Sequence, residues 1–443
     1  MPAPENVAKE LGSLLRAAQA KRLPSVSAAV VRKGEVLWAD AVGYAGVEDE
    51  REATPETQYR IGSITKTFTA TAIVQLREAG ELGLDDPLSK HLPDAHHGQP
   101  TLRRMLAHLS GLQREPHGDI WESLESPDDA GLLAGLAHAE QVLEPAQAHH
   151  YSNLAFALLG HVVAARSGMP YRDYVDERII RPLGLERTSW EREEPSALGY
   201  LVDPYANVAK RERDDVDLRG ASAAGQLWST TADLCRWAAF LAEGHEGVLA
   251  PGAVERMWFP QVMSDPDAWT LGWGLGLMLM RRDDRVFGGH GGGMPGHLSG
   301  VYVDRKSGIG GVALTNSGSN AEMDELAVAL ALKGIELLPD DPEPWWPEED
   351  APPELRGALG RWWSEGAEFV FGWNKGKLEA RLATAPATRP PSVFEPVDGE
   401  TLRTVSGREQ GELLRLVRDE QGEIERMYWA TYPFTRTQAT FGP

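Results

Sequence analysis

The chain contains one cysteine, Cys235, among 443 residues, so it cannot form a disulfide bond within itself. It has no apolar run near the ~20 residues that a membrane-spanning helix needs, and its N-terminus lacks the apolar core of a secretion signal. Lys and Arg number 44 against 66 Asp and Glu, which leaves a formal net charge of -22. A nucleic-acid partner needs clustered positive charge and is therefore not expected. The same absences predict a cytoplasmic protein without membrane contact.

The composition is otherwise that of a folded protein, with 42% hydrophobic residues and 14 Trp. Leucines at helical spacing predict an amphipathic helix within the first 20 residues, and apolar, β-branched segments at 25–32 and 35–42 predict a hairpin. Helices are also expected at 63–78, 231–241 and 320–338, and strands at 285–289, 300–304 and 309–316. Thr230 and Asp233 form a capping-box pattern at the start of the second of these helices. Strands at both ends of residues 1–338 predict one α+β domain whose ends meet in a single sheet.

The C-terminal part has a different composition. Residues 339–353 contain six prolines and many acidic residues, which predicts a semi-rigid linker. Residues 354–443 show short strand-like segments broken by glycine turns, which predicts a small all-β barrel or sandwich. We therefore expect an α+β domain, a linker and a β domain.

Candidate metal ligands are few. His96-His97 and His149-His150 are adjacent pairs without a nearby cysteine or a helical companion, so they are predicted to be loop surface. Cys235 lies on an apolar helix face and is predicted to be part of the core. We therefore expect neither a metal nor a cofactor.

Ser63 and Lys66 form the only Ser-x-x-Lys in the chain. A spacing of three places the Lys66 amine on the helix face of Ser63, and a serine at a helix N-terminus faces the positive end of the dipole. A lysine whose pKa is lowered by burial can serve as the general base for such a serine. The alternative is an ordinary serine cap on a solvated helix. No Gly-x-Ser-x-Gly sequence occurs, which disfavours an α/β-hydrolase.

Two further segments are candidates for the same site. In Tyr151-Ser152-Asn153, the phenol could pass protons between nucleophile and lysine while the amide orients them; a plain loop tyrosine is the alternative. In FGGHGGGMPGHLSG, His290 adds a titratable donor and the glycines allow close approach of a ligand to the backbone. A flexible loop between two strands is the alternative there.

The order Ser-x-x-Lys, Tyr-x-Asn and His-x-Gly resembles the signature of the penicillin-recognising serine hydrolases. The chain is similar to the branch that contains class C β-lactamases, D-peptidases and related esterases. The segments LPSVSAAVVRKGEVLW, MLAHLSGL, GQLWSTTADLCRW and LGWGLGLML carry the likeness beyond the three motifs. It covers about residues 7–338. The resemblance implies a β-lactamase/DD-peptidase-like domain, with an antiparallel sheet flanked by helices and a separate helical region.

The resemblance also implies roles for the motif residues. Ser63 would be the acylated nucleophile, Lys66 its base and Tyr151 a proton shuttle. Asn153 would support Lys66 and the amide of the substrate. Because these residues are intact, a catalytically silent binding protein on the same fold is disfavoured.

The third motif would form the strand beside the substrate. His290, Gly291 and Gly292 correspond to it, and the backbone N–H groups of Ser63 and Gly293 would form the oxyanion hole. Many β-lactamases and cell-wall transpeptidases carry lysine where this chain has His290. A neutral or partly charged histidine anchors a carboxylate less firmly, so this departure argues against efficient β-lactam hydrolysis.

The overall plan resembles the penicillin-binding-protein-type thioesterases, which take a nonribosomal peptide thioester and close it head to tail. That likeness implies a lipocalin-like C-terminal domain, with Arg436 a candidate for touching the substrate. The thioester would be free or presented on a carrier protein. A surface arginine bridging two strands is the alternative for Arg436. An esterase, a D-amino-acid peptidase or a weak β-lactamase is the alternative for the whole chain.

Overall fold

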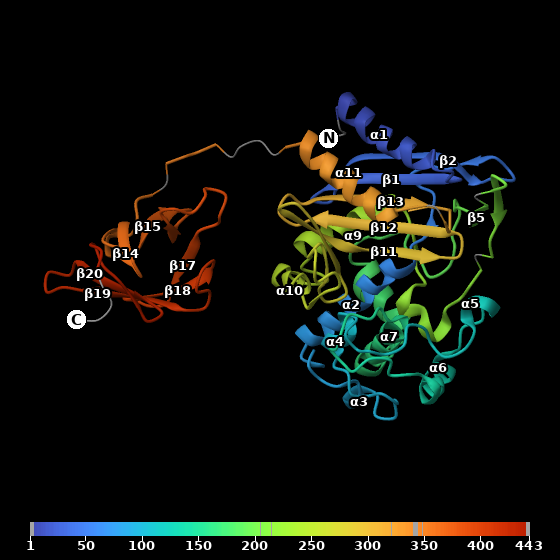
Figure 1. Ribbon diagram of the computed structural model, residues 1–443, viewed down its shortest axis with the longest axis horizontal. Helices are drawn as coiled ribbons and strands as arrows, with labels where there is room; N and C mark the ends of the chain where they lie inside the picture. The colour runs from blue at the N-terminus through green and yellow to red at the C-terminus, as the bar shows by residue number, and fades with distance from the viewer. Residues whose placement is uncertain are drawn as a thin grey trace. The chain divides into compact units, whose positions relative to one another are not determined.

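The computed structural model shows two compact units, Met1–Asp340 and Asp341–Pro443 (Figure 1). The structure describes residues 4–203, 205–213, 215–319, 321–339, 344–347 and 349–439. The predicted linker at 339–353 therefore lies partly outside the described residues, and so does Asn320, the predicted start of the last helix of the first domain. Within the described part of the chain, no helix combines the length and the apolar composition needed to cross a bilayer.

The first unit is built on a nine-stranded antiparallel sheet, in the order β3-β2-β1-β13-β12-β11-β10-β9-β8. The strands are β1 (Ser25–Arg32), β2 (Glu35–Gly46), β3 (Arg51–Glu52), β8 (Val262–Met263), β9 (Leu271–Trp273), β10 (Met278–Arg282), β11 (Arg285–Met294), β12 (His297–Asp304) and β13 (Ile309–Thr315). β1 pairs with β13 along its length, so the two ends of this unit meet in one sheet, as predicted. Two short pairs lie outside it: β4 (Tyr59–Arg60) with β7 (Trp228–Ser229), and β5 (Tyr200–Asp203) with β6 (Val208–Arg211).

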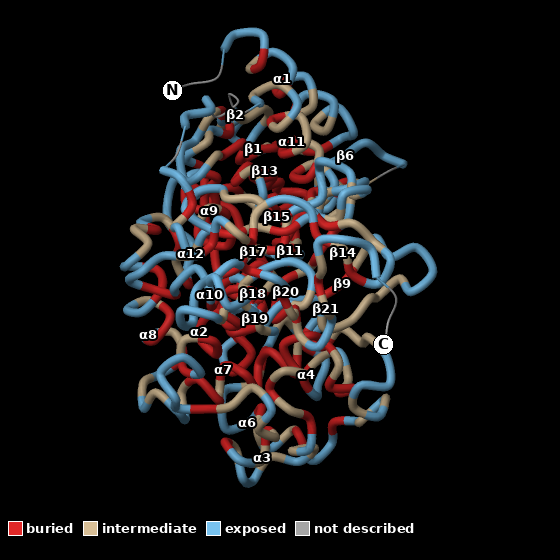
Figure 2. Tube along the Cα trace, turned by 90° about the vertical axis from the view of Figure 1, so that its left-hand side faces the viewer, coloured by how far each residue is buried: buried red, intermediate tan, exposed pale blue. Residues whose placement is uncertain are grey.

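Helices cover both faces of this sheet. Ala28 and Val30 of β1 pack in the cluster with α1 (Glu5–Gln19) and α11 (Met323–Leu337). Ala29 and Val31 point the other way, into the cluster that contains α9 (Thr231–Glu243) and the helical region. Because successive side chains alternate between faces, a strand buried on both sides reads as a continuous apolar run. β1 and β13 are accordingly buried along almost their whole length (Figure 2).

The helical region lies beyond β11 and is organised around α2 (Thr65–Glu78) and α7 (Asn153–Ser167) (Figure 1). Its other elements are α3 (Leu88–His91), α4 (Leu102–Leu106), α5 (Ile120–Ser123), α6 (Asp129–Gly135), η2 (Leu136–His138), α8 (Tyr171–Val175), η3 (Asp176–Ile180) and η4 (Arg219–Ala224). α10 (Pro251–Met257) packs against α9 instead. α2 is buried on nearly every side. The hydroxyls of Thr67, Thr69 and Thr71 donate to backbone carbonyls; Thr67 Oγ1, for example, donates to Ile64 O at 2.7 Å.

Two predicted features differ in detail from the structure. The Thr230 hydroxyl caps α9 by accepting the Asp233 N–H, but the Asp233 carboxylate accepts from Arg187 N and Thr188 Oγ1 instead of completing a capping box. The glycine-rich segment is not a loop between strands: β11 continues through it to Met294, five residues beyond its predicted end. Cys235 is fully buried in α9, as predicted.

The second unit is an eight-stranded antiparallel meander that nearly closes into a barrel. A short helix, α12 (Pro353–Arg356), precedes β14 (Gly360–Ser364), β15 (Ala367–Asn374), β16 (Lys377–Leu382), β17 (Ser392–Pro396), β18 (Thr401–Ser406), β19 (Leu413–Arg418), β20 (Ile424–Trp429) and β21 (Tyr432–Phe434). Trp363 and Thr435 exchange two backbone hydrogen bonds, of 2.8 and 3.0 Å, which join the first strand to the end of the last. Aromatic side chains that include Trp362, Phe371 and Phe394 fill the interior. This agrees with the predicted lipocalin-like domain.

Arg436 lies where this barrel closes. Its guanidinium donates to the carbonyl oxygens of Arg361 and Gly357, and its Cζ lies 3.9 Å from the centroid of the Trp362 ring. It thus joins the last strand to the α12–β14 corner, as in the alternative interpretation of a bridging arginine. Its contact with a substrate stays a prediction.

Replacing Arg436 with alanine should therefore destabilise the barrel. We expect Arg436→Ala to lower the free energy of unfolding of this unit by about 1–3 kcal/mol, because two hydrogen bonds and a cation–π contact are lost. Hydrogen exchange of the β14 and β21 amides measures the effect, with the exposed Arg389→Ala as the control. Unchanged exchange together with lost activity would instead assign Arg436 to the substrate.

Candidate active site

Ser63 lies in a 3-10 turn, η1 (Gly62–Ile64), which runs directly into α2. Gly62 has a φ of +49°, which strains any residue that carries a side chain. A Cβ at Gly62 would also lie 2.7 Å from the backbone nitrogen of Gly293, so this turn packs backbone to backbone against β11. Ser63 is therefore held between the start of a buried helix and the glycine-rich strand.

Lys66 is fully buried, one turn along the same helix. Its Nζ is hydrogen-bonded to Ser63 Oγ at 2.9 Å and to Ala224 O, in η4, at 2.6 Å. Burial lowers the pKa of Lys66 well below its usual range, while the nearby Glu115 carboxylate acts in the opposite direction. A neutral amine at this distance can take the proton of the serine hydroxyl, as the Ser-x-x-Lys pattern predicts.

Tyr151 lies against both of these residues. Lys66 Nζ is 5.0 Å from the centroid of its ring, and so is the guanidinium carbon of Arg114. Burial raises the pKa of the Tyr151 phenol, although its hydrogen bond to Ser63 lowers it. The phenol therefore stays protonated at rest and can give a proton to a leaving group or pass one on from Lys66.

Asn153 begins α7, after the Ser152 side chain that caps this helix. Its Nδ2 donates to Glu115 Oε1 at 2.6 Å, whereas the Lys66 amine is bonded to Ser63 and Ala224. The expected support of Lys66 by Asn153 is thus indirect: Asn153 holds the carboxylate whose charge acts on Lys66. A carboxylate is a stronger acceptor for the amide than a neutral amine is, which explains the preference.

His290 comes from β11 and is 2% exposed. Burial and the proximity of Lys66 lower the pKa of His290 to about 3, so the imidazole is neutral. Its Nδ1 is hydrogen-bonded to Gly291 O, which places the ring hydrogen there and leaves Nε2 as an acceptor. Nε2 has no hydrogen-bond partner among the described residues. The ring lies 6.1 Å from that of Tyr151, centroid to centroid.

The next two glycines allow β11 to pack tightly against its neighbours. A Cβ at Gly292 would lie 1.9 Å from Ile61 O, and one at Gly291 would lie 2.1 Å from Asp324 Oδ1. These are distances that real side chains do not adopt. Gly292 therefore requires glycine for the strand to reach the serine-bearing turn, because the clash there is with backbone. At Gly291 the clash is with the Asp324 carboxyl group at the start of α11, which would have to move aside.

Ser63 and Gly293 line the same cleft, as an oxyanion hole made from their N–H groups requires. The remaining lining residues are Glu115, Pro116, Ile120, Trp121, Asn153, Leu218, Ala221, Ala224, Gly225 and Met294. The free volume is about 30 Å³, room for one or two water molecules. Glu115 is the only carboxylate among these residues, and most of the others are apolar.

The sequence interpretation did not identify several residues of the site. Glu115 and Ala224 carry no motif, because they reach Lys66 only through the folding of the chain. His149, predicted to be loop surface, is half-buried and its ring stacks on Trp273 at 5.3 Å. His108 lies in the quoted segment MLAHLSGL, and its ring stacks on Tyr151. The family resemblance of that segment was the only feature of the sequence that pointed to His108.

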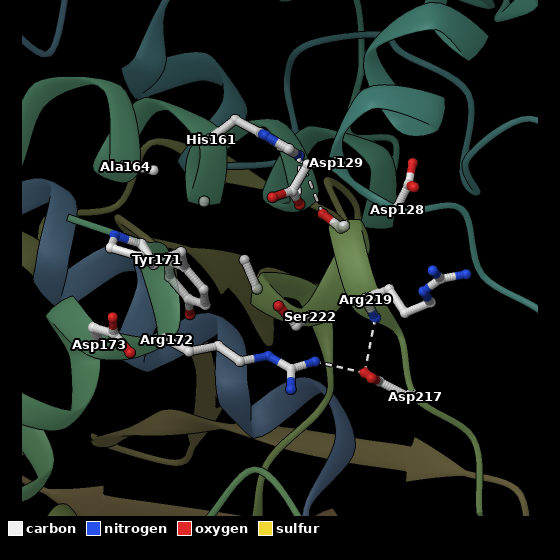
Figure 3. A pocket seen from close by; sticks show the side chains of 14 residues that line it. Asp128, Asp129, His161, Ala164, Tyr171, Arg172, Asp173, Asp217, Arg219 and Ser222 are labelled. Atoms are coloured by element: carbon white, nitrogen blue, oxygen red, sulfur yellow. Dashed lines mark hydrogen bonds and ion pairs between the residues drawn. The ribbon is translucent and has the colours of Figure 1, made fainter. Parts of the chain in front are cut away.

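A larger cavity of about 430 Å³ lies on the other face of η4 (Figure 3). Its walls include Tyr171, Arg172 and His161, and Arg172 forms an ion pair there with Asp217. η4 separates the two spaces, since Ala223 faces this cavity while Ala224 faces the Ser63 cleft. No group of three or more His, Cys, Asp or Glu side chains suited to a metal ion occurs in the part of the chain that the structure describes.

Comparison with known proteins agrees with this geometry. The family model described as Beta-lactamase matches residues 11–334, and one described as Domain of unknown function (DUF7586) matches residues 351–436. The chain is 31% identical over 234 residues to Beta-lactamase-like protein 2 of Dictyostelium discoideum. That match covers 49% of this chain and 42% of the relative, so the chain spans less than half of the relative's length.

Solved structures extend the likeness. D-amino acid amidase from Ochrobactrum anthropi SV3 matches with a TM-score of 0.63 and 28% identity, over 75% of this chain and 99% of that chain. The octameric penicillin-binding protein homologue from Pyrococcus abyssi matches with a TM-score of 0.64 and 24% identity, over 96% of this chain and 99% of that chain. The second likeness shows a shared fold.

The charge of Glu115 should be visible in the pH dependence of acylation. Glu115 raises the pKa of Lys66 against the effect of burial, so its removal should lower that pKa further. We expect Glu115→Gln to move the acid limb of kcat/KM to lower pH, because Lys66 then stays neutral over a wider range. The assay uses an uncharged aryl ester, because the Glu115 carboxylate could bind a positively charged substrate directly and its loss would then change substrate binding as well. The exposed Glu122→Gln should leave the limb in place; a shift to higher pH for Glu115→Gln would contradict the assignment.

The packing of β11 against the serine turn can be tested with two glycine variants. In Gly292→Ala, the clash with Ile61 O should displace the Gly293 N–H and lower kcat by ~10²–10³-fold, the usual effect of losing one oxyanion donor. In Gly293→Ala, the new Cβ meets only Leu298 Cδ2, at 3.3 Å, so the loss should be much smaller. Burst kinetics with an aryl ester measure both. Equal losses of kcat in the two variants would show that the close packing of Gly292 against Ile61 O does not determine the position of the Gly293 N–H.

Proposed function

The chain belongs to the Beta-lactamase family of serine hydrolases, and on that premise we propose that it closes peptide thioesters head to tail through an acyl-Ser63 intermediate. The observation that supports this function is the cleft beside Ser63. It is small and mostly apolar, and it holds a single carboxylate, Glu115. The apolar lining offers a resolving water few hydrogen-bond partners, whereas Glu115 offers the N-terminal amino group of the peptide an anionic partner.

In the first half of the reaction, Ser63 Oγ attacks the thioester carbonyl and its proton passes to Lys66 Nζ. The N–H groups of Ser63 and Gly293 stabilise the oxyanion. The C–S bond then breaks, and the leaving thiolate takes a proton that Lys66 supplies through the Tyr151 hydroxyl. The product is an ester of Ser63, with Lys66 neutral again.

In the second half, the N-terminal amine of the same peptide attacks that ester. A C–N bond forms, the bond to Ser63 Oγ breaks, and the proton lost by the amine returns to Oγ through Lys66 and Tyr151. Attack within one chain has an effective concentration of order 10⁵ M or more when the groups are well placed, far above that of water. The thioester is free or is presented on a carrier protein.

We also propose that the acylating residue is glycine or has the D configuration. The likeness to the Ochrobactrum anthropi D-amino acid amidase supports this, because it extends over 99% of that protein at 28% identity. The same likeness favours a second candidate function, the hydrolysis of D-amino-acid amides or esters. In that case Glu115 would hold the α-ammonium of the acyl residue itself.

One assay separates the two functions. Short peptides that carry a C-terminal thioester on a D-residue, an L-residue or glycine are offered, and the products are identified by mass. The proposal predicts mainly cyclic peptide, one water lighter than the acid, from the D and glycine substrates. An N-acetylated copy of each peptide cannot cyclise and serves as the matched substrate control.

The nucleophile is tested in the same assay. Ser63→Ala should give neither product nor a covalent adduct in the intact mass, since only one oxygen is removed and the fold is kept. An adduct on this variant would overturn the assignment of Ser63. Exclusive formation of linear acid by the wild type would overturn cyclisation and leave the amidase or esterase function.

A further inference from the structure

His108 is a fully buried histidine that none of the catalytic steps above uses. It follows α4, and its φ is +55°, in the left-handed region that residues other than glycine seldom occupy. Such a conformation costs free energy and persists only where the surroundings enforce it. The contacts of His108 show which part of the site this conformation supports.

Three contacts join His108 to Tyr151 and its neighbours. The N–H of His150 donates to His108 O at 2.8 Å, and the N–H of Ser152 donates to His108 Nδ1 at 3.1 Å. The His108 ring stacks on the Tyr151 ring, with 4.1 Å between centroids and 26° between planes. One residue thus holds the backbone on both sides of Tyr151 and one face of its ring.

The protonation state of His108 follows from these contacts. Because Nδ1 accepts a hydrogen bond, the single ring hydrogen is on Nε2. Burial lowers the pKa of His108 well below its usual range, and Lys66, His290, His149 and Arg114 act in the same direction. A proton on Nδ1 would break the hydrogen bond from the Ser152 N–H, so the contacts of His108 with the Tyr151 segment require a neutral imidazole ring.

We propose that His108 is a positioning residue for Tyr151: its Nδ1 and its ring fix the phenol so that the hydroxyl stays on Ser63. The inference rests on the acyl-enzyme step of the proposed function and not on which group resolves the intermediate. Displacing a proton-transfer group by about 1 Å costs ~10²-fold in rate, which sets the expected size of the effect.

Two variants separate the hydrogen bond from the stacking. In His108→Asn, the amide oxygen stands where Nδ1 stood, and asparagine tolerates the positive φ. In His108→Phe, the ring remains but the Ser152 N–H loses its acceptor. We expect the acylation rate constant with an aryl ester, measured in the burst phase, to fall ~10²-fold in His108→Phe and clearly less in His108→Asn, with the affinity for the ester nearly unchanged. The buried His91→Asn, in α3, is the control and should keep the wild-type rate.

A double-mutant cycle tests whether His108 acts through Tyr151. In the Tyr151→Phe background, His108→Phe should cause little further loss, because there is no hydroxyl left to position. Additive losses would show a general structural role and overturn the proposal. A folded His108→Phe variant with the wild-type rate of acylation would also overturn the proposal.

A spectroscopic measurement keeps the test independent of activity. In ¹⁵N-histidine spectra of the wild type, His108 should show a protonated Nε2 and an unprotonated Nδ1 throughout pH 5–9. An imidazolium, or a hydrogen on Nδ1, at pH 7 would overturn the proposal whatever the enzyme does. A wild type that forms no covalent acyl adduct with an aryl ester, by intact mass after rapid quenching, would count against the acyl-enzyme function and would leave this spectroscopic result as the decision on His108.

Discussion

The burial of the Lys66 amine is the constraint on which the site depends. In water this group would be charged, and in the helical core its charge is penalised. Among the described residues, the amine is compensated by two hydrogen bonds, to Ser63 Oγ and Ala224 O, and by the nearby carboxylate of Glu115. A surface lysine one turn after a serine would make the same sequence pattern without the chemistry.

The same constraint explains the other titratable groups around it. His290 and His108 are both buried near Lys66. Both are neutral mainly because burial penalises their charged forms, and also because the positive charge that Lys66 carries when it is protonated disfavours a second charge nearby. Neutral rings add no charge to the space where the oxyanion develops. They act on the site instead through ring packing and through the hydrogen bonds of individual ring nitrogens. The position of the single ring hydrogen therefore decides which contacts each histidine makes.

Glycines join this buried helix to the sheet. Gly62 on the serine turn and Gly292 on β11 both lie where a Cβ would collide with the backbone of the other segment. The close approach brings Gly293 beside Ser63 and fixes the cleft between them. η4 completes the opposite wall, because its consecutive carbonyls accept from Thr69 and Lys66 of α2.

Much of this protein is determined by local sequence. Periodicity and turn residues were enough to predict the hairpin, α2, α9 and the β domain. Three short motifs were enough to propose Ser63, Lys66, Tyr151 and His290 as candidates for one site, because such motifs depend on residue type and near-neighbour spacing. Tertiary structure alone decided the rest. Glu115 and Ala224 reach the site from segments whose local pattern carries no sign of chemistry. His108 lies in a segment that resembles the family, but only the fold places its ring on Tyr151. β11 extends through its glycines because neighbouring backbone, not propensity, stabilises it. Such contacts depend on which segments the core brings together, and no spacing along the chain encodes them.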